Sequence, residues 1–415
     1  MTSIRIVAGA LSLCALLAAT PQLAAAQATP PASPSPAVSP SPAPSPSPTP
    51  KLLQFSGSID AGYTGASGTN KLRFTNGVPS TVFGGAVGPY FDANGGRLIM
   101  PANDFVNSPT LQDANVQLTI NGKTIGGKLE GIFGTDADFV ASNGQSRSGA
   151  NLAQAYISYT GGPLTAIVGK FWTLAGVEVA EAPGNTNYSR SFLFGYAIMS
   201  SFTGVRATYV VNPKVTVIAG ANNGWDDWKF AGKKKTIEGS LALTPSPGYS
   251  LNLTTYNGND FAVFGNSALG MPPVYTNRML YDGILTMHPT SALTLIANYD
   301  NGTQLGDAFG AFPTSHWNGI AGYVNYQFNP KYGISLRKET FRDTQGFRTG
   351  LAQRLQSNTA TLNYTPNATM IYRAEYRMDT SDGNNFLSNS IDPLTTLPLG
   401  RNHQNTFGAE AVVKF

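Results

Sequence analysis

The sequence is short of the residue types on which much protein chemistry depends. Its 415 residues include one cysteine, three histidines and only 12% charged residues. No stretch after residue 26 is apolar over the roughly 18 residues that a membrane-spanning helix needs. The scarcity of cysteine argues against a disulfide framework, a zinc–thiolate site and a cysteine nucleophile. The formal net charge of +4 is spread without long basic runs, which argues against a nucleic-acid partner.

The first 26 residues have the anatomy of a secretory signal peptide. Arg5 precedes the apolar run "IVAGALSLCALLAA", and Ala24-Ala25-Ala26 offers the small residues of a cleavage site. We expect cleavage after Ala26, which removes Cys14 and, by taking Arg5 from the total of +4, leaves a charge of about +3. A lipid-modified Cys14 is the alternative, but Leu13 is bulkier than the residue usual before such a site.

Residues 27–51 are predicted to form a disordered periplasmic segment. The stretch "TPPASPSPAVSPSPAPSPSPTP" at 29–50 has proline at nearly every second position and lacks the apolar side chains of a core. Such a composition favours extended polyproline II, at about 3.1 Å per residue, with a reach on the order of 70 Å. We interpret it as a solvated spacer; contact with the cell wall or another envelope component is the alternative.

From residue 52 to residue 415 the chain repeats about ten residues of alternating side chains followed by a turn. In "FSGSIDAGY", for example, Phe55, Ile59 and Tyr63 share one side of the segment. A period of two predicts strands with one apolar and one polar face. Sixteen strands are predicted, at 52–64, 112–121, 124–134, 151–160, 163–172, 201–211, 214–222, 235–244, 248–257, 277–288, 292–301, 316–328, 331–341, 355–364, 368–378 and 404–415.

Short and long connections alternate along these strands. The short ones, such as "NGK" at 121–123 and "NPK" at 329–331, rely on residues that favour tight reversals. The long ones lie at 65–111, 135–150, 173–200, 223–234, 258–276, 302–315, 342–354 and 379–403. Outer-membrane barrels show this asymmetry, because their periplasmic turns are short and their extracellular loops long. We therefore predict an all-β, transmembrane antiparallel β-barrel of about 16 strands, with both termini periplasmic.

The last ten residues, "TFGAEAVVKF", fit this barrel. Phe407, Val413 and Phe415 lie on the apolar face of the final strand, which has to pair with the first strand to close the sheet. A terminal aromatic strand of this kind resembles the signal read by the outer-membrane assembly machinery. Tyrosines near strand ends on the apolar face are expected to form the interfacial girdles: Tyr63, Tyr159, Tyr209, Tyr249, Tyr299 and Tyr364.

One segment, "GKFWTLAGVEVAEAPGNTNYSRSFLFGYAIMSSFTGVRATY" at 169–209, resembles the signature region of the β-barrel porin family described as OmpL-like. The matching positions are Gly169-Lys170-Phe171, Gly176 with Glu178, Asn185 with Tyr188-Ser189-Arg190-Ser191, and Thr203-Gly204-Val205-Arg206. Further matches are "NNGWDD" (222–227), "LYDGILTMHP" (280–289) and "YRAEYRMDTSDG" (372–383). The resemblance covers most of 52–415 and implies an outer-membrane barrel with a pore function, without naming a solute. The family's usual proline before the sixth strand is replaced near Met199.

A barrel of sixteen strands is wide enough to hold water, so its inward face is predicted to line a pore. Alternation turns these residues inward: Lys128, Glu130, Gln154, Arg206, Glu238, Asn252, Asn298, Arg337, Glu339, Arg373, Glu375, Arg377 and Glu410. Charges of both signs on such a wall sort solutes by charge and size. The alternative is that each residue only supplies the polar face that any barrel has.

The connection at 173–200 is the third long loop. By analogy with trimeric general porins, it is expected to fold inward and constrict the lumen. Glu178 and Glu181 would then face the wall arginines across an eyelet, and Arg190 belongs to the same candidate set. The apolar run "SFLFGYAIM" at 191–199 predicts that this loop packs against other residues. An external packed cap is the alternative.

The remaining chemistry is sparse. His288, His316 and His403 are not predicted beside a serine or carboxylate on one wall, so an enzyme built on the barrel is disfavoured. "DTSDGNN" at 379–385 lacks the spacing of a calcium loop. No metal or cofactor is predicted.

The predicted function is an outer-membrane porin for passive diffusion of small hydrophilic solutes. The expected partners are outer-membrane lipid, the solutes and the assembly machinery, and a homotrimer is left open. The alternative function is a non-conducting surface barrel for adhesion or envelope structure.

Overall fold

A computed structural model describes residues 52–66, 108–142, 145, 148–230, 234–263, 274–306, 313–349, 352–383, 386–391 and 398–415. The expected leader at 1–26 and the proline-rich segment at 27–51 lie outside these residues. Sixteen strands form a closed antiparallel barrel in which neighbours in the chain are neighbours in the sheet. No helix of the described part is long and apolar enough to cross a membrane.

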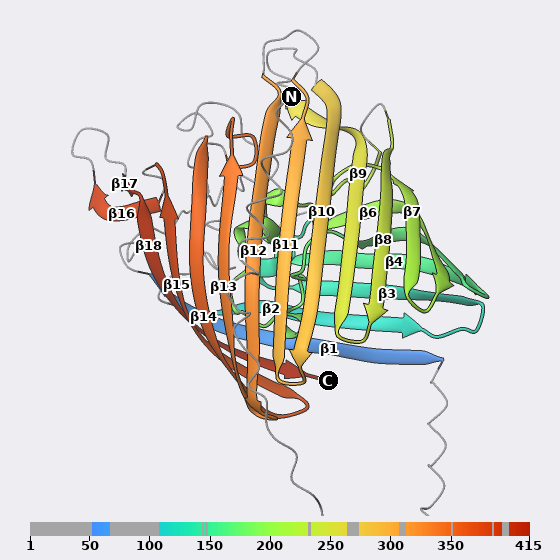
Figure 1. Ribbon diagram of the computed structural model, residues 1–415, viewed down its shortest axis with the longest axis horizontal. Helices are drawn as coiled ribbons and strands as arrows, with labels where there is room; N and C mark the ends of the chain where they lie inside the picture. The colour runs from blue at the N-terminus through green and yellow to red at the C-terminus, as the bar shows by residue number, and fades with distance from the viewer. Residues whose placement is uncertain are drawn as a thin grey trace, which may run out of the picture. The chain divides into compact units, whose positions relative to one another are not determined.

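The barrel strands lie side by side in the order in which they follow along the chain (Figure 1). Their bounds are β1 Leu53–Ala66, β2 Ser108–Ile120, β3 Ile125–Phe133, β4 Ala150–Gly161, β5 Leu164–Trp172, β6 Ser201–Asn212, β7 Val215–Asn222, β8 Thr236–Ser246, β9 Tyr249–Val263, β10 Val274–Thr290, β11 Leu293–Gln304, β12 Ser315–Asn329, β13 Tyr332–Asp343, β14 Gln353–Asn367, β15 Met370–Ser381 and β18 His403–Lys414. Each overlaps one predicted strand, so the predicted fold class is confirmed. The largest difference is at β9, which continues to Val263 where the alternation predicts an end at 257.

The connections hold small elements that the alternation does not predict. A short helix α2 (Thr135–Phe139) follows β3, and η2 (Ala182–Gly184) and η3 (Leu193–Ala197) lie between β5 and β6. Two short strands, β16 (Phe386–Ile391) and β17 (Pro398–Arg401), pair as a separate sheet inside the predicted loop at 379–403.

The first and last strands close the cylinder. β1 and β18 pair antiparallel from Ser58 opposite Lys414 to Ala66 opposite Thr406. The terminal residue takes part, since Phe415 N donates to Gly57 O at 3.0 Å and Gly57 N donates to Phe415 O at 2.9 Å. Closure gives every barrel strand a partner on both sides, which is the condition for extended backbone in lipid.

Alternation along the strands sorts the side chains to two faces. Large apolar residues such as Phe55, Ile157 and Leu362 are exposed on the outside, at 70%, 61% and 58%. Five of the six girdle tyrosines are among these exposed residues, and Tyr364 is half-buried. Nearly all of the predicted inward-facing polar residues are buried; Lys128 and Asn252 are half-buried.

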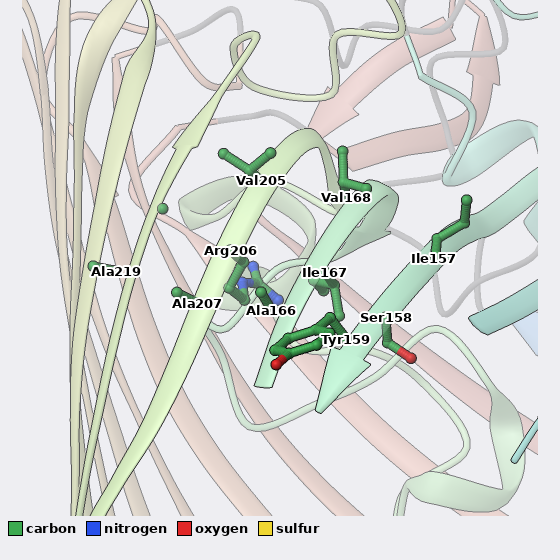
Figure 2. Close-up of a pocket in the computed structure, with 11 residues that line it drawn as sticks. Ile157, Ser158, Tyr159, Ala166, Ile167, Val168, Val205, Arg206, Ala207 and Ala219 are labelled. Atoms are coloured by element: carbon green, nitrogen blue, oxygen red, sulfur yellow. The ribbon is translucent and has the colours of Figure 1, made fainter. Parts of the chain in front are cut away.

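The outer face also carries a shallow groove of about 280 Å³ on β4–β7 (Figure 2). Its lining includes the exposed side chains of Ile157, Tyr159, Val168 and Val205. Arg206 follows Val205 on β6, and alternation sends its side chain to the opposite face of the sheet. The groove therefore belongs to the apolar outside of the barrel and is no candidate for a site of hydrophilic solutes.

Candidate functional site

The connection between β5 and β6 crosses the interior of the barrel. We call residues 173–200 the inner loop. At one end, Leu174 N donates to the hydroxyl of Tyr256 on β9 at 2.9 Å. Further along, the Tyr188 hydroxyl lies 2.8 Å from Thr64 Oγ1 on β1 and accepts a bond from Gln112 Nε2 on β2 at 2.6 Å. β9 and β1 are eight places apart in the ring of sixteen strands, so the loop reaches from one wall to the opposite wall.

Three arginines of the wall bind the middle of the inner loop. Arg337 on β13 donates through Nη1 to Ser189 O at 2.6 Å and through Nη2 to Ser189 Oγ at 2.9 Å. Arg377 on β15 donates to Arg190 O at 2.6 Å, and Arg373 on the same strand donates to the carbonyls of Ala182 and Asn185. Hydrogen bonds from charged donors contribute more than neutral ones, so these guanidinium groups pin the loop backbone.

Three carboxylates bind the same stretch from the acceptor side. Glu375 Oε2 accepts from Tyr188 N at 2.8 Å, and its Oε1 accepts from Ser189 N at 3.1 Å. Glu339 Oε2 accepts from Phe192 N at 2.6 Å. Glu178, which belongs to the loop itself, accepts from Ser191 N at 2.6 Å. Several backbone donors and acceptors between Asn185 and Phe192 are thus satisfied by side chains inside the barrel.

The charged side chains also pair with one another. Arg337 Nη1 lies 2.7 Å from Glu178 Oε1, and Arg337 Nε lies 3.4 Å from Glu339 Oε1. Arg377 pairs with Asp379 at 2.7 Å, and Arg373 pairs with Glu410 on β18. Arg206 donates to both oxygens of Glu238, at 2.7 and 3.0 Å. The charges of both signs expected on the inner wall are present and largely paired.

The sequence expectation of an eyelet differs from this geometry in two respects. Glu178 does face a wall arginine, but it touches Arg337 directly, with no gap between the two groups. The Glu181 carboxylate instead accepts a bond from Trp172 Nε1 at 3.1 Å. Burial raises the pKa of Glu181 to about 7, and the nearby negative charge of Glu130 raises it as well. Arg190 turns back on its own loop and donates to the carbonyls of Val179, Tyr188 and Ala180.

Tyr188 packs against two glycines of the barrel wall, Gly62 and Gly408. A Cβ built on Gly408 of β18 would lie 2.4 Å from Tyr188 Cδ1, and one built on Gly62 of β1 would lie 2.7 Å from the Tyr188 hydroxyl oxygen. Both distances are shorter than real Cβ contacts, so only glycine leaves room for the ring. The spacing of these glycines in the sequence carries no sign of this role.

An apolar core holds the other half of the inner loop. Phe192, Leu193, Tyr196, Ile198 and Met199 are fully buried, which agrees with the packing predicted for 191–199. Their partners on the inward face of the wall were missed by the sequence analysis: Phe171, Phe202, Tyr256, Leu280, Trp317, Tyr323, Phe341 and Leu355. These residues fall on the polar phase of the alternation, and that exception was the signal available in the sequence. Trp317 Nε1 also donates to Ala197 O at 3.0 Å.

Carboxylates outnumber bases on the wall near β1 and β2. Asp60 and Asp113 are opposite each other across β1 and β2, both are fully buried, and neither Asp113 oxygen has a hydrogen-bond partner. Within the described residues, however, no group of three or more histidines, cysteines or acids has a geometry that could hold a metal ion. Among the described residues, this part of the wall therefore holds closely spaced acidic side chains but no metal-binding group.

Solved structures of outer-membrane proteins, among them a porin and a channel, share this fold. OmpT of Vibrio cholerae, in a trimer form, matches with a TM-score of 0.54 and 10% identity, over 88% of this chain and 99% of that one. An anion-selective porin from Comamonas acidovorans matches with a TM-score of 0.56 and 11% identity, over 88% and 99%. The outer membrane channel DcaP of Acinetobacter baumannii matches with a TM-score of 0.53 and 12% identity, over 88% and 97%. At these identities the likeness concerns the fold.

The sequence itself gives the family. No curated protein matches the chain. A family model matches residues 53–415, which is the whole barrel, and its description is "Putative beta-barrel porin-2, OmpL-like". The match agrees with the resemblance carried by the segment at 169–209. The chain belongs to this family of β-barrel porins of the bacterial outer membrane.

Proposed function

We propose that the protein is a passive diffusion channel for small hydrophilic solutes, narrowed by its inner loop. The observation that carries the proposal is the division of the closed barrel into an apolar outside and a charged inside. Ile157 and Leu362 are exposed on the outer face, whereas Arg337 and Glu339 are buried on the inner face. An interior lined by charges of both signs favours water and polar solutes over apolar ones.

The inner loop is the proposed constriction, and the wall residues that hold it are its supports. Arg337, Arg373, Arg377, Glu339 and Glu375 bind the loop backbone, so their main role is to fix its position inside the barrel. Glu178 helps to fix the loop in the same position through its ion pair with Arg337. The proposed pore-lining set therefore acts on solutes chiefly by setting how wide the opening beside the loop is.

The arrangement in the membrane is also a proposal. Short turns face the periplasm and long connections face the outside, which places both termini of the chain on the periplasmic side. Residues 1–26 would direct export and residues 27–51 would form a periplasmic spacer. Phe407, Val413 and Phe415 would be read by the assembly machinery. A homotrimer is consistent with the trimer form of the similar OmpT structure.

Ion conductance tests the proposal directly. Purified, folded protein in a planar lipid bilayer should give stepwise conductance in potassium chloride, and loaded liposomes should swell in small sugars. The packed apolar core of the inner loop favours a second reading, a non-conducting surface barrel. Silent bilayers from protein that is folded by circular dichroism and heat-modifiable gel mobility would support that second reading and refute the channel.

A further inference from the structure

The outward face of β13 changes from apolar to basic partway along the strand. Tyr332 and Leu336, toward the short-turn end, are exposed as expected of a lipid-facing wall. Lys338 and Arg342 occupy the same face further on and are exposed as well. The inward-facing residues of this part of β13 are all buried: Arg337, Glu339, Phe341 and Asp343. The basic residues are therefore part of the outer surface and not the result of a local shift in register.

The neighbouring strand extends this surface. Arg354 on β14 lies directly opposite Arg342, and Asn358 lies opposite Lys338. Gln356, between Arg354 and Asn358 on the same face, is exposed with them. We call Lys338, Arg342 and Arg354 the outer basic patch. The outward positions of β13 and β14, all of which are described, include no carboxylate.

No carboxylate in the described part of the chain forms an ion pair with a side chain of the outer basic patch. No hydrogen bond or ion pair of the Lys338, Arg342 or Arg354 side chains is found there, although Arg354 N donates to Asp382 Oδ1 at 2.8 Å. Like charges directly opposite each other on a sheet destabilise it. The arginines of the inner face, by contrast, each have carbonyl or carboxylate partners. The Arg342–Arg354 pair therefore places two like charges side by side on the outer surface.

The height of the patch indicates the source of an anion that would neutralise it. Arg342 is ten residues beyond Tyr332 along β13, which is about 33 Å of strand. A tilt of about 40° reduces this to a rise of about 25 Å, which matches the height of the apolar band of an outer-membrane barrel. Arg342 and Arg354 then lie at the far interface, on the side of the long connections. Lys338 lies lower, and its flexible stem can extend its ammonium group toward the same interface.

We propose that the outer basic patch binds the phosphate groups of an anionic lipid in the outer leaflet. Arg342 and Arg354 clasp one phosphate, because two guanidinium forks on adjacent strands offer paired donors to its oxygens. Lys338 contributes a third positive charge from below, and Gln356 and Asn358 offer neutral hydrogen bonds. The inference rests on the orientation proposed above, and it is independent of whether the barrel conducts.

Native mass spectrometry of the purified, folded protein tests this site with lipid A, a diphosphorylated glycolipid. The double variant Arg342→Gln/Arg354→Gln should retain lipid A about tenfold more weakly than the wild type. Arg354→Lys, which keeps the charge but loses the fork, should fall between the two. The matched control Lys123→Gln/Lys214→Gln removes two exposed charges from the short turns and should bind like the wild type. Lipid A stripped of its phosphates should bind the wild type as weakly as the double variant binds intact lipid.

Each remaining outcome counts against the proposal. Equal retention by the wild type and the double variant would overturn it, as would equal retention of intact and phosphate-free lipid A. Displacement of lipid A by millimolar inorganic phosphate would indicate a site for free phosphate instead. A change of oligomeric state in the double variant would assign the patch to contact with a second copy of the chain. Bilayer recordings on the same samples separate this question from the channel proposal, because a silent barrel can still bind lipid.

Discussion

Glu178 of the inner loop and Arg337 of β13 form a buried ion pair, with Oε1 and Nη1 separated by 2.7 Å. Removing one partner of such a pair costs about 3–5 kcal/mol when the other charge is left unpaired, and less here, because Arg337 Nε stays 3.4 Å from Glu339 Oε1. Glu178→Gln should therefore raise the population of detached inner loop by about tenfold or more, at about 1.4 kcal/mol per tenfold. Single-channel recordings should show larger and noisier conductance steps than the wild type.

Lys338, which follows Arg337 on β13 and faces the outside of the barrel, provides the control for this prediction. Lys338→Gln removes a charge from the outside of the same strand and should leave the step size unchanged. Trypsin offers an independent measurement, because the bond after Arg190 is protected while the loop is held in place. Glu178→Gln protein that resists cleavage there and conducts like the wild type would show that the pair does not hold the loop.

The packing of Tyr188 against Gly62 and Gly408 leads to a second prediction. Gly408→Val places a side chain where the Tyr188 ring now lies, and overpacking of this kind costs about 1–3 kcal/mol. The ring should leave the wall, its bonds to Thr64 and Gln112 should break, and trypsin should cleave after Arg190. Gly322→Val is the matched control, since a Cβ at Gly322 meets nothing within 4 Å. Equal cleavage of the two variants would show that the space left by Gly408 does not hold Tyr188 in place.

The strands were predictable from the sequence because each repeats a local rule. A period of two specifies a face for every residue, and short Gly, Pro and Asn turns specify where strands reverse. The pairing of β1 with β18 also followed, since an open edge cannot stand in lipid. Only the ends were uncertain, as at β9, where Gly258, Asn259 and Asp260 continue the ladder with β10 without a clear apolar phase.

The inner loop was predictable only in outline. Its apolar run at 191–199 indicated packing, but the partners Trp317, Tyr323 and Phe341 lie more than one hundred residues away. Alternation alone predicts that the inward face contacts water. Apolar residues on that face therefore have no evident role until the inner loop is known to pack against them. The pairing of Glu178 with Arg337 depends on the three-dimensional path of the loop in the same way.

The last strand gives a prediction about assembly. Phe415 is 61% exposed on the outer face while its backbone completes the pairing with Gly57. Phe415→Ala removes the aromatic ring and keeps the backbone bonds, so we expect less folded barrel in outer membranes but unchanged conductance for each assembled channel. Phe328→Ala, which removes an outward ring that is 58% exposed at the end of β12, is the control. Equal amounts of heat-modifiable protein for all three forms would refute a special role for the terminal ring.

Glu181 makes the position of the inner loop sensitive to pH. Burial, followed by the charge of Glu130, raises the pKa of Glu181 to about 7, while Lys128 opposes the shift. In a detached, solvated loop the same carboxyl would titrate near the ordinary value of about 4.3. The docked state therefore holds a proton that the detached state releases between these two values, and docking is favoured at low pH. As the pH rises toward 7, that advantage is lost.

Bilayer recordings between pH 5 and pH 8 measure this effect. Wild-type conductance should become larger or noisier as the pH rises from 5 to about 7 and should level off above that, because the loop detaches more often as the docking advantage is lost. Glu181→Gln cannot ionise, keeps a group able to accept the bond from Trp172, and should flatten this part of the profile. Asp382→Asn, which removes an exposed carboxyl outside the barrel interior, should leave the profile as it is in the wild type. If Glu181→Gln and the wild type give the same pH dependence, the titrating group lies elsewhere on the wall.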